Sequence, residues 1–585
     1  RDYIVKLKAG LEVHQQLDCG KLFCNCDNLE SGSNQTFSRT LHATSSEMGS
    51  IDVAAQAEGI RKFTYHNRSC NCLVYTDEEP PRGPNEDAVR IAVQFAKLAG
   101  AKIIEEVQFM RKVVVDGSNT SGFQRTGLIA VGGQIEYEGG KLELDQICLE
   151  EDSCRHGENK DEYLLDRLGI PLLEVTTKPQ LKKPEDVQNA ARALGRLLRA
   201  CRVKRGLGTI RQDVNISIDN GQRVELKGFQ DLATMPKVVE NEIHRQENLN
   251  DLKQGKPGNQ KDVTGLISKK KGTAMACKLV GWKGLLGTKM SAKEHVRMGR
   301  ELADYAIKAG IEDYSETFVK GLMHSDELPA YGISEEETQK ISDVLMCKED
   351  DAFVLIFGEK TTVESALDNV IQRVKFHGVP QEVRRVTPKG LTRYLRPMSG
   401  ASRMYPETDI APVNLRDFDV VLPKTLDQRE SDLPLNDEES RQMVARNLDL
   451  RFHRLMEQIE DPKNISRVLL HTLPNLSSTG HIFVTDDDIL QVLSFVKDGK
   501  IAKEGIENAL VQASMGDEIE TGSDNIDDEV ELLIDNLVQK KMDFVKDKGM
   551  DAVGPLMGLV MSEFRGKMDG AKINALLIKR IEQEI

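Results

Sequence analysis

The sequence predicts a multidomain α+β protein, with a β-rich first half, an α+β unit in the middle and helical domains at the end. A chain of 585 residues is too long for one hydrophobic core, so we expect several domains. Strand-like alternation dominates the first half, whereas the helical period dominates from about residue 422 onward. The composition, 39% hydrophobic and 30% charged, is typical of a folded globular protein.

Two helices in the first half are marked by their ends. Residues 86–99 follow Asn85, which suits a helix N-cap, and stop before Gly100. Residues 184–201 begin with Pro184, which suits the first turn, and place their apolar residues on one stripe. We expect both helices to be core elements that carry no chemistry.

Changes in composition along the chain predict its domain boundaries. A stretch rich in lysine and glycine at 254–273 ends the β-rich region, and an acidic linker near residue 515 divides the helical part. The expected domains are residues 1–272, 273–398, 422–514 and 515–585, with a short segment at 399–421 between the second and the third.

Charge and hydropathy exclude some classes of protein. No apolar run approaches the ~18 residues needed to cross a bilayer, and no leader is visible at Arg1, so we expect a cytoplasmic protein without a membrane partner. The net charge of −15 disfavours a non-specific coat for nucleic acid. It is compatible with a tRNA enzyme, because local basic patches decide where a polyanion binds.

The ten cysteines do not form a disulfide scaffold, but four of them occur as two CxC pairs, Cys24/Cys26 and Cys70/Cys72. Zinc takes four thiolates from two such short loops, which predicts a structural zinc site. Four unrelated loop thiols are the alternative, because a CxC pair is tighter than the usual CxxC pair.

The most informative signal is a charged face on five predicted strands. In residues 210–218, Val214 and Ile216 alternate with Asp213 and Asn215. A solvent-facing strand would also be polar, but grouped carboxylates repel one another unless a cation neutralises them. The charged residues of the other four segments are Glu12 and His14, Glu174, Glu225 and Lys227, and the run Glu150, Glu151 and Asp152.

Such carboxylates predict a magnesium-dependent phosphoryl-transfer site on a sheet, because Mg²⁺ binds through a few carboxylates together with substrate phosphates. The sequence has no GxxxxGK[ST] loop and no set of glycine-rich loop, HRD and DFG motifs. A P-loop and a protein-kinase fold are therefore both excluded as the ATP site. The residue types alone identify no substrate.

Six motifs include these strands: KAGLEVHQQLD, KLFCNC, LEEDSCR, GIPLLEVTT, GTIRQDVNISI and VELKGF. Together they resemble the GatB/GatE family of tRNA-dependent amidotransferases. In that family the archaeal GatE branch carries an inserted domain similar to one in bacterial aspartyl-tRNA synthetases. GRELADYA, HSDELPAYGI and EDDAFVLI, all within residues 273–398, resemble that insertion and favour the archaeal branch.

The resemblance implies that residues 1–272 form a catalytic cradle for a two-step reaction. The γ-carboxylate of glutamate on tRNA(Gln) would attack the γ-phosphate of ATP, and ammonia would then displace phosphate to give Gln-tRNA(Gln). ATP and Mg²⁺ are the implied cofactors. The implied partner is an asparaginase-like glutaminase, the D subunit, which would supply ammonia in a heterotetramer of two D and two E subunits.

The resemblance also assigns roles by position. The family's metal and active-site positions correspond to Glu12, His14, Glu150, Glu151, Glu174, Asp213 and Glu225. We expect His14, Glu151 and Asp213 to bind Mg²⁺ directly. Histidine is an unusual Mg²⁺ ligand, so a proton relay or a structural role is the alternative for His14.

Other residues are assigned to substrate, ATP or tRNA. Lys112, Lys227, Arg211 and Asn215 are the candidates for phosphate, ATP or ammonia, although Lys227 could equally be a solvated strand residue. Tyr405 and Glu407 in MYPETDI, within 399–421, are expected to close the active site or handle ammonia. Arg565, Lys567 and Lys572 in the last domain are expected to bind tRNA.

Two other functions stay open. A B subunit of the bacterial-type three-subunit amidotransferase would share the strand motifs but lack the insertion. A non-catalytic tRNA-binding protein would bind acylated tRNA without consuming ATP.

Overall fold

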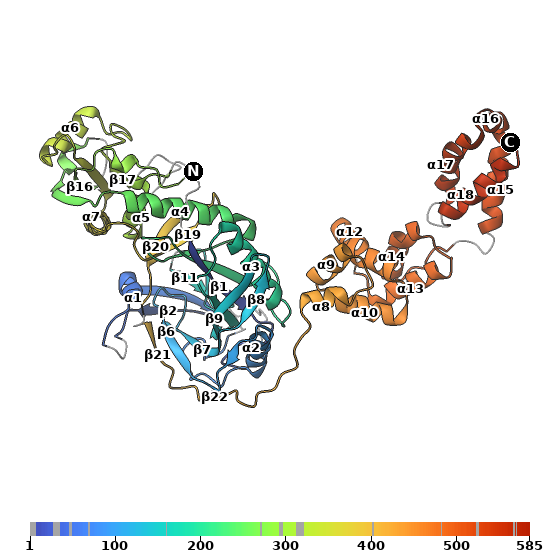
Figure 1. Cartoon of the computed structure of the whole chain (residues 1–585), viewed down its shortest axis with the longest axis horizontal. Coiled ribbons are helices and arrows are strands. Elements are labelled where there is room, and N and C mark those ends of the chain that lie inside the picture. The colour runs from blue at the N-terminus through green and yellow to red at the C-terminus, as the bar shows by residue number, and fades with distance from the viewer. Residues whose placement is uncertain are drawn as a thin grey trace. The chain divides into compact units, whose positions relative to one another are not determined.

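The computed structural model divides into two compact units, Arg1–Pro423 and Lys424–Ile585 (Figure 1). None of the helices among the described residues is both long and apolar enough to span a membrane. The residues described are 7–26, 35–45, 49–67, 71–159, 161–268, 272–291, 296–311, 321–400, 403–480, 483–521, 526–564, 568 and 570–584.

The first unit is built on a 12-stranded sheet with the order β20-β19-β14-β13-β1-β12-β9-β7-β6-β21. The five strands predicted to carry a charged face are consecutive neighbours in it, and all their pairings are antiparallel. Segments far apart in the sequence therefore share one surface. These strands are β14 (Val224–Lys227), β13 (Ile210–Ser217), β1 (Lys8–Gln16), β12 (Pro171–Thr177) and β9 (Gly140–Glu151).

Shorter strands complete the sheet. They are β4 (Lys102–Ile103), β6 (Phe109–Val113), β7 (Phe123–Val131), β8 (Gln134–Tyr137), β19 (Glu382–Val386), β20 (Thr392–Pro397) and β21 (Met404–Pro406). A second sheet has the order β10-β11-β3-β2, with β10 (Arg155–His156), β11 (Glu162–Leu164), β3 (Arg61–Asn67) and β2 (Gln35–Leu41). Helix α1 (Val53–Glu58) precedes β3, and β5 (Glu106–Val107) pairs with β22 (Val413–Asn414).

Helices cover the apolar face of the large sheet. Helix α2 (Glu86–Leu98) packs on β7 and β9, α3 (Pro184–Leu198) on β1 and β8, and α4 (Met235–Asp251) on β13. The Asn85 side chain accepts hydrogen bonds from the N–H groups of Asp87 and Ala88, as an N-cap should. Both predicted helices are confirmed, each ending one to three residues earlier than expected. The opposite face of the central strands is left for the charged residues.

The inserted unit has its own sheet in the order β15-β16-β18-β17. Its strands are β15 (Lys256–Asp262), β16 (Thr273–Val280), β17 (Leu322–His324) and β18 (Ala352–Gly358), and its helices are α5 (Met298–Lys308), α6 (Glu335–Val344) and α7 (Lys360–Lys375). Both expected boundaries of residues 273–398 need correction. The unit's sheet already begins with β15, which pairs with β16, and it ends before β19, because β19 pairs in parallel with β14 and β20 pairs with β19. The main sheet therefore resumes at β19.

A buried ionic network joins α5 of the insertion to α4 and β19. Arg384 donates to Glu301 at 3.0 Å and to Glu382 at 2.6 Å. Arg245 donates to Glu382 at 2.7 Å and also pairs with Glu301. All four side chains are at most 4% exposed, so each charge depends on its partners for compensation.

Replacing Glu301 with glutamine is expected to destabilise the first unit by about 3 kcal/mol, because two buried guanidinium groups lose a shared carboxylate. Urea unfolding at pH 7 measures the change. The matched control is Glu336→Gln, which removes an exposed carboxylate paired with Lys340 on α6 and should leave stability unchanged. A Glu301 variant as stable as this control would contradict the network's role.

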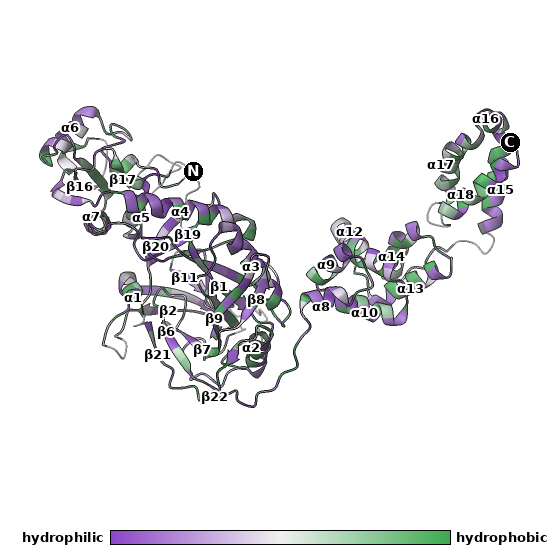
Figure 2. Cartoon of the chain, viewed as in Figure 1, coloured by the Kyte–Doolittle hydropathy of each residue, from purple (hydrophilic) through white to green (hydrophobic). Residues whose placement is uncertain are grey.

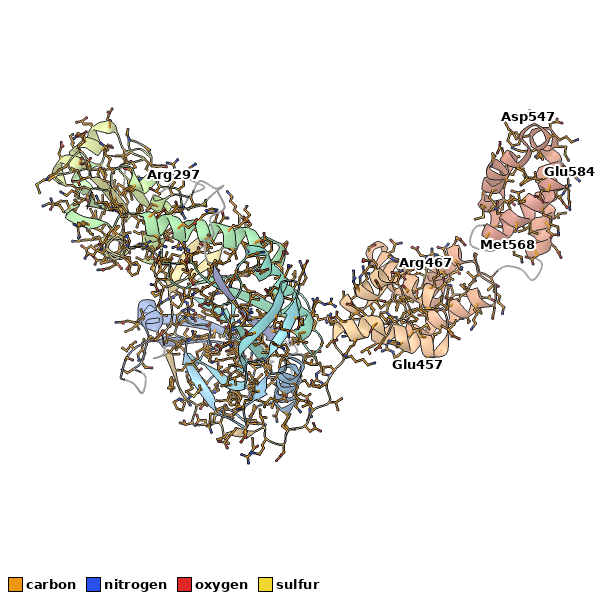
Figure 3. All side chains as sticks on the ribbon, viewed as in Figure 1. Arg297, Glu457, Arg467, Asp547, Met568 and Glu584 are labelled. Atoms are coloured by element: carbon orange, nitrogen blue, oxygen red, sulfur yellow. The ribbon has the colours of Figure 1, made fainter. Side chains whose placement is uncertain are left out.

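The second unit is helical and contains two apolar cores. The first core lies among α8 (Leu426–Ser431), α9 (Asp437–Ala445), α10 (Asp449–Gln458), α11 (Pro462–Arg467), α12 (Leu473–Thr479), α13 (Asp486–Lys497) and α14 (Ile506–Met515). The second lies among α15 (Ile526–Lys540), α16 (Met542–Lys548), α17 (Val553–Phe564) and α18 (Gly570–Glu582), with apolar stripes visible in Figure 2. Met568, labelled in Figure 3, belongs to the second core.

Candidate active site

The charged face of the central strands lines a cavity of about 730 Å³. That volume suits a small-molecule ligand, for which pockets of ~300–1,000 Å³ are usual. The predicted residues that line the cavity are Glu12, His14, Lys112, Glu150, Glu174, Arg211, Asp213, Asn215, Glu225 and Lys227. The structure therefore brings together ten residues that were predicted from six separate segments of the sequence.

Strand register explains why these side chains meet. Glu12 on β1 lies opposite Asp213 on β13, and His14 lies opposite both Glu174 on β12 and Arg211 on β13. Opposite residues in antiparallel strands point to the same face, so their side chains are neighbours. Strand β1 is therefore the centre of the site.

His14 and Lys112 lie among three carboxylates. The Nε2 atom of His14 is 3.6 Å from Glu12, 3.4 Å from Glu150 and 3.5 Å from Glu174. The Nζ atom of Lys112 donates to Glu150 at 2.9 Å and to Glu174 at 3.1 Å. Glu150 is almost fully buried, which makes these contacts strong.

A second group of carboxylates lies beside the first. Oxygens of Glu12, Asp213 and Glu225 all lie within 4.8 Å of one another, close enough to share one cation. The Nζ atom of Lys227 donates to Asp213 at 2.6 Å and pairs with Glu225. Lys227 therefore points into the site, and the alternative of a solvated strand residue is not supported. Glu12 alone belongs to both groups.

The pKa values reflect how unevenly the positive charge is shared. Burial and the nearby Glu174 raise the pKa of Glu12. Burial would raise the pKa of Glu174, but Lys112 and His14 lower it well below its usual range. Burial would likewise raise the pKa of Glu225, but Lys227 lowers it. Of these three carboxylates, Glu12 is therefore the one that the neighbouring cations stabilise least.

His14 is held as a cation by its surroundings. Burial lowers the pKa of His14, but the hydrogen bond to Glu174 and the charges of Glu150, Glu174 and Glu12 raise it to about 9. Metal binding by His14 would have to displace this proton, whereas Glu12, Asp213 and Glu225 offer carboxylate oxygens directly. These surroundings suit a charged donor to Glu174, while His14 also forms a second group of possible ligands with Glu12 and Glu174. Direct binding of Mg²⁺ by His14 stays a prediction.

The charge count tests whether a divalent cation fits. Glu12, Glu150, Glu174, Asp213 and Glu225 contribute five negative charges, and His14, Lys112 and Lys227 contribute three positive ones. These eight side chains carry a local surplus of two negative charges before the arginines that also line the cavity are counted. The donors of Glu12, Asp213 and Glu225 are the carboxylate oxygens that Mg²⁺ prefers. The residues present fit the ion.

Glu151 is the expected ligand that the structure does not bring to this site. Its Oε1 atom accepts the backbone N–H of Arg125 at 3.0 Å and lies 3.4 Å from the Arg125 guanidinium. Successive residues of a strand point to opposite faces, so Glu151 leaves the face that carries Glu150. Glu12 occupies the position in the cluster that was predicted for Glu151.

Tyr405 and Glu407 do not line the cavity either. Strand β21, which contains Tyr405, pairs with β6 at the edge of the sheet. Glu407 accepts hydrogen bonds from Arg111 at 2.7 and 3.0 Å and from Arg125 at 2.7 Å. Burial would raise the pKa of Glu407, but these hydrogen bonds lower it to about 2. The carboxylate of Glu407 is already bonded to Arg111 and Arg125. Tyr405 and Glu407 therefore stabilise the edge of the sheet beside β6.

Three of the four expected zinc ligands come together. The sulfurs of Cys24, Cys26 and Cys72 lie within 4.8 Å of one another. Cys70 lies outside the described residues. Three sulfurs from two loops suit the tetrahedral thiolate site that zinc prefers. This cluster is separate from the cavity, whose lining includes no cysteine among the described residues.

The expected tRNA-binding residues lie in the second unit. Lys572 on α18 pairs with Asp527 on α15, at 2.6 and 2.7 Å, and its side chain is exposed. Arg565 and Lys567 lie outside the described residues.

Four arginines that line the cavity were not predicted from the sequence: Arg167, Arg223, Arg396 and Arg403. Arg223 directly precedes β14. Arg167 precedes β12, while Arg396 and Arg403 lie at and beyond the end of β20. Arg167 stands two residues before the motif GIPLLEVTT, which is a signal that could have identified it. Arg396 and Arg403 reach the cavity because the main sheet resumes after the insertion, which no local pattern indicates.

Comparisons with known proteins agree over almost the whole chain. A family model described as the GatB/GatE catalytic domain matches residues 7–420, and a GatB domain model matches residues 451–581. A relative from Thermococcus gammatolerans, named as the E subunit of glutamyl-tRNA(Gln) amidotransferase, is 39% identical over 99% of this chain and 98% of its own length. Relatives of the same name from Archaeoglobus fulgidus and Methanocaldococcus jannaschii are 40% and 39% identical, over 99% of this chain and 98% and 99% of their own lengths.

Proposed function

Because the chain belongs to the GatB/GatE amidotransferase family, we propose that it is the ATP-dependent subunit that converts Glu-tRNA(Gln) to Gln-tRNA(Gln). One observation carries the proposal: carboxylates that fit Mg²⁺ and cations that suit phosphate line one cavity. The relatives named as E subunits favour this over a bacterial-type B subunit.

The reaction has two steps in which every bond is accounted for. A γ-carboxylate oxygen of the tRNA-bound glutamate attacks the γ-phosphorus of ATP, and the bond to the bridging oxygen breaks to release ADP. Ammonia then attacks the carbonyl carbon of the acyl phosphate, inorganic phosphate leaves with the bond electrons, and a proton is lost. Phosphorylation is needed because an unactivated carboxylate has no adequate leaving group.

Glu12, Asp213 and Glu225 would hold Mg²⁺, which would neutralise charge on the triphosphate. Lys112 and Lys227 keep the neighbouring carboxylates in place and offer positive charge to the phosphoryl oxygens. His14 donates a hydrogen bond to Glu174 and forms an ion pair with Glu150, so it orients both carboxylates. Asn215 and Arg211, which line the same cavity, contact ATP or substrate.

The partner in this proposal is an asparaginase-like glutaminase, the D subunit, which releases ammonia beside the cavity. Two D and two E subunits form a heterotetramer. Ammonia that reaches the acyl phosphate inside the complex avoids protonation by bulk water, which would remove its nucleophilic electron pair.

Transamidation by the full chain tests the function directly. The chain is incubated with Glu-tRNA(Gln), ATP, Mg²⁺ and ammonium, and the amino acid on the tRNA is identified after hydrolysis. We expect glutamine only when ATP and Mg²⁺ are both present. Tight tRNA binding with no glutamine and no ADP would instead support the non-catalytic tRNA-binding protein.

We also propose that Cys24, Cys26, Cys70 and Cys72 hold a structural zinc ion. Purified protein is expected to contain about one zinc per chain by elemental analysis. Cys72→Ser should lower the zinc content and the unfolding temperature together, whereas Cys201→Ser, at a buried cysteine outside the cluster, should leave the zinc content unchanged. Equal zinc in both variants would contradict the site.

The last domain is proposed to bind tRNA through Arg565, Lys567 and Lys572. Deleting residues 516–585 is expected to weaken tRNA binding about tenfold, because several phosphate contacts are lost. Filter binding measures the affinity, and urea unfolding of the first unit serves as the control for folding. Unchanged affinity in the shortened chain would mean that the first unit holds the tRNA alone.

A further inference from the structure

A buried carboxylate behind the cavity wall holds two arginines. Asp152, directly after β9, has a side chain that is only 1% exposed. Its oxygens accept from Arg211 Nη2 at 2.8 Å, Gln16 Nε2 at 2.7 Å and the backbone N–H of Ser153 at 2.8 Å. Arg167 Nε lies 3.5 Å from the same carboxylate. A buried charge with this many donors fixes the side chains around it.

The two guanidinium groups reach the cavity. Arg167 is further fixed because it donates to the backbone carbonyls of Ser153 at 3.1 Å and of Cys154 at 3.0 Å. Both arginines line the cavity, and their side chains are 27% and 37% exposed. A guanidinium has five N–H donors, so each arginine keeps donors that its protein contacts do not use.

The charge of this group is not balanced. Within the part of the chain that the structure describes, Asp152 is the carboxylate paired with both Arg167 and Arg211. One negative charge therefore faces two positive charges, and the wall keeps a net charge of one positive unit. This is the opposite of the acidic cluster, where the carboxylates are in surplus. A positive wall of fixed guanidinium groups suits the planar fork geometry of phosphate recognition.

The arginine pair lies next to the acidic cluster. Arg211 is the cross-strand neighbour of His14, whose Nε2 is 3.4 to 3.6 Å from three carboxylates of the cluster. A ligand that carries several linked phosphates could contact a cation held by the carboxylates and the guanidinium pair together. A triphosphate has this shape and charge.

We propose that Arg167 and Arg211 bind the phosphate chain of ATP, and that Asp152 is the positioning residue that holds both guanidinium groups against the cavity. This inference rests on the proposed function and assigns the nucleotide's place within it. The same chemistry would also recognise phosphates of the tRNA acceptor end, so the test must separate these two ligands.

Equilibrium binding to the full chain separates them. ATP with Mg²⁺ and tRNA(Gln) are titrated independently into wild type, Arg167→Gln and Arg211→Gln. We expect each variant to weaken ATP binding about tenfold and to change tRNA affinity less than twofold. Inorganic tripolyphosphate should displace ATP from the wild-type protein but should no longer do so in the variants. The control is Arg155→Gln, an exposed arginine paired with Asp166 that does not line the cavity.

Asp152→Asn tests positioning. It should weaken ATP binding in the wild-type background but change it less than twofold when Arg167 and Arg211 are already glutamine, because no guanidinium remains to be held. A structural role would instead lower the unfolding temperature equally in both backgrounds. If Asp152→Asn does not fold, the ATP affinities of Arg167→Gln and Arg211→Gln still test the inference, because both arginines are partly exposed.

Two results overturn the inference. Unchanged ATP affinity in both arginine variants removes the site, and a loss of tRNA affinity alone assigns these arginines to tRNA. If wild type binds no ATP, the proposed function fails as well. If wild type binds ATP and transamidates while the variants bind ATP equally well, only this inference fails.

Discussion

Replacing Glu12 with glutamine is expected to lower the rate of tRNA-dependent ATP cleavage about a thousandfold. Glu12 belongs to both carboxylate groups, and burial beside Glu174 raises its pKa. Glutamine keeps the size of the side chain, but its neutral amide removes one of the three carboxylates, those of Glu12, Asp213 and Glu225, that would hold a divalent cation. Single-turnover release of ADP in the presence of Glu-tRNA(Gln) measures the effect.

Glu151→Gln is the comparison that matters most for this prediction. Glu151 lies on the opposite face of its strand, beside Arg125, so its loss should affect stability more than the dependence on Mg²⁺. We expect Glu12→Gln to raise the Mg²⁺ concentration needed for half-maximal activity and Glu151→Gln to leave it unchanged. The reverse pattern would return Glu151 to the metal site and contradict the observed arrangement.

Replacing Lys112 with methionine is expected to lower kcat/KM for ATP cleavage about a hundredfold. Burial would lower the pKa of Lys112, but Glu150 and Glu174 raise it, so the ammonium stays charged across the physiological range. Methionine keeps the length but leaves two buried carboxylates without this partner. Their protonation would then rise, and the cluster would lose the charge that attracts the cation.

Steady-state kinetics at several pH values checks this second prediction. Lys178→Met is the matched control, because Lys178 pairs with Glu143 on an exposed part of the same sheet. It should retain wild-type activity. A Lys112 variant as active as the Lys178 variant would show that the contact with Glu150 and Glu174 has no part in catalysis.

The sequence was sufficient for the strands but not for their order. Alternation of apolar and charged residues identified the segments that became β1, β9, β12, β13 and β14. That β1 lies between β12 and β13 depends on pairing between residues about 160 to 200 positions apart. Such pairing follows from tertiary packing, which no local pattern records.

The errors at the site have physical causes of the same kind. Glu150 and Glu151 look equivalent in LEEDSCR, yet strand alternation sends them to opposite faces. Glu407 stands in a motif that suggests chemistry, but Arg111 and Arg125 occupy its carboxylate. Those arginines lie almost 300 residues earlier in the chain. Alternation could have corrected the first assignment, and only the fold could correct the second.

The central claim is that the glutamate carboxylate on tRNA is phosphorylated before ammonia attacks. Glu-tRNA(Gln) labelled with ¹⁸O in both γ-carboxylate oxygens tests it most directly, with ATP, Mg²⁺ and ammonium supplied to the full chain. The bridging oxygen of an acyl phosphate leaves with phosphate, so mass spectrometry should find one ¹⁸O in the inorganic phosphate released for each glutamine formed. Glutamine formed alongside phosphate that carries no label would contradict the claim.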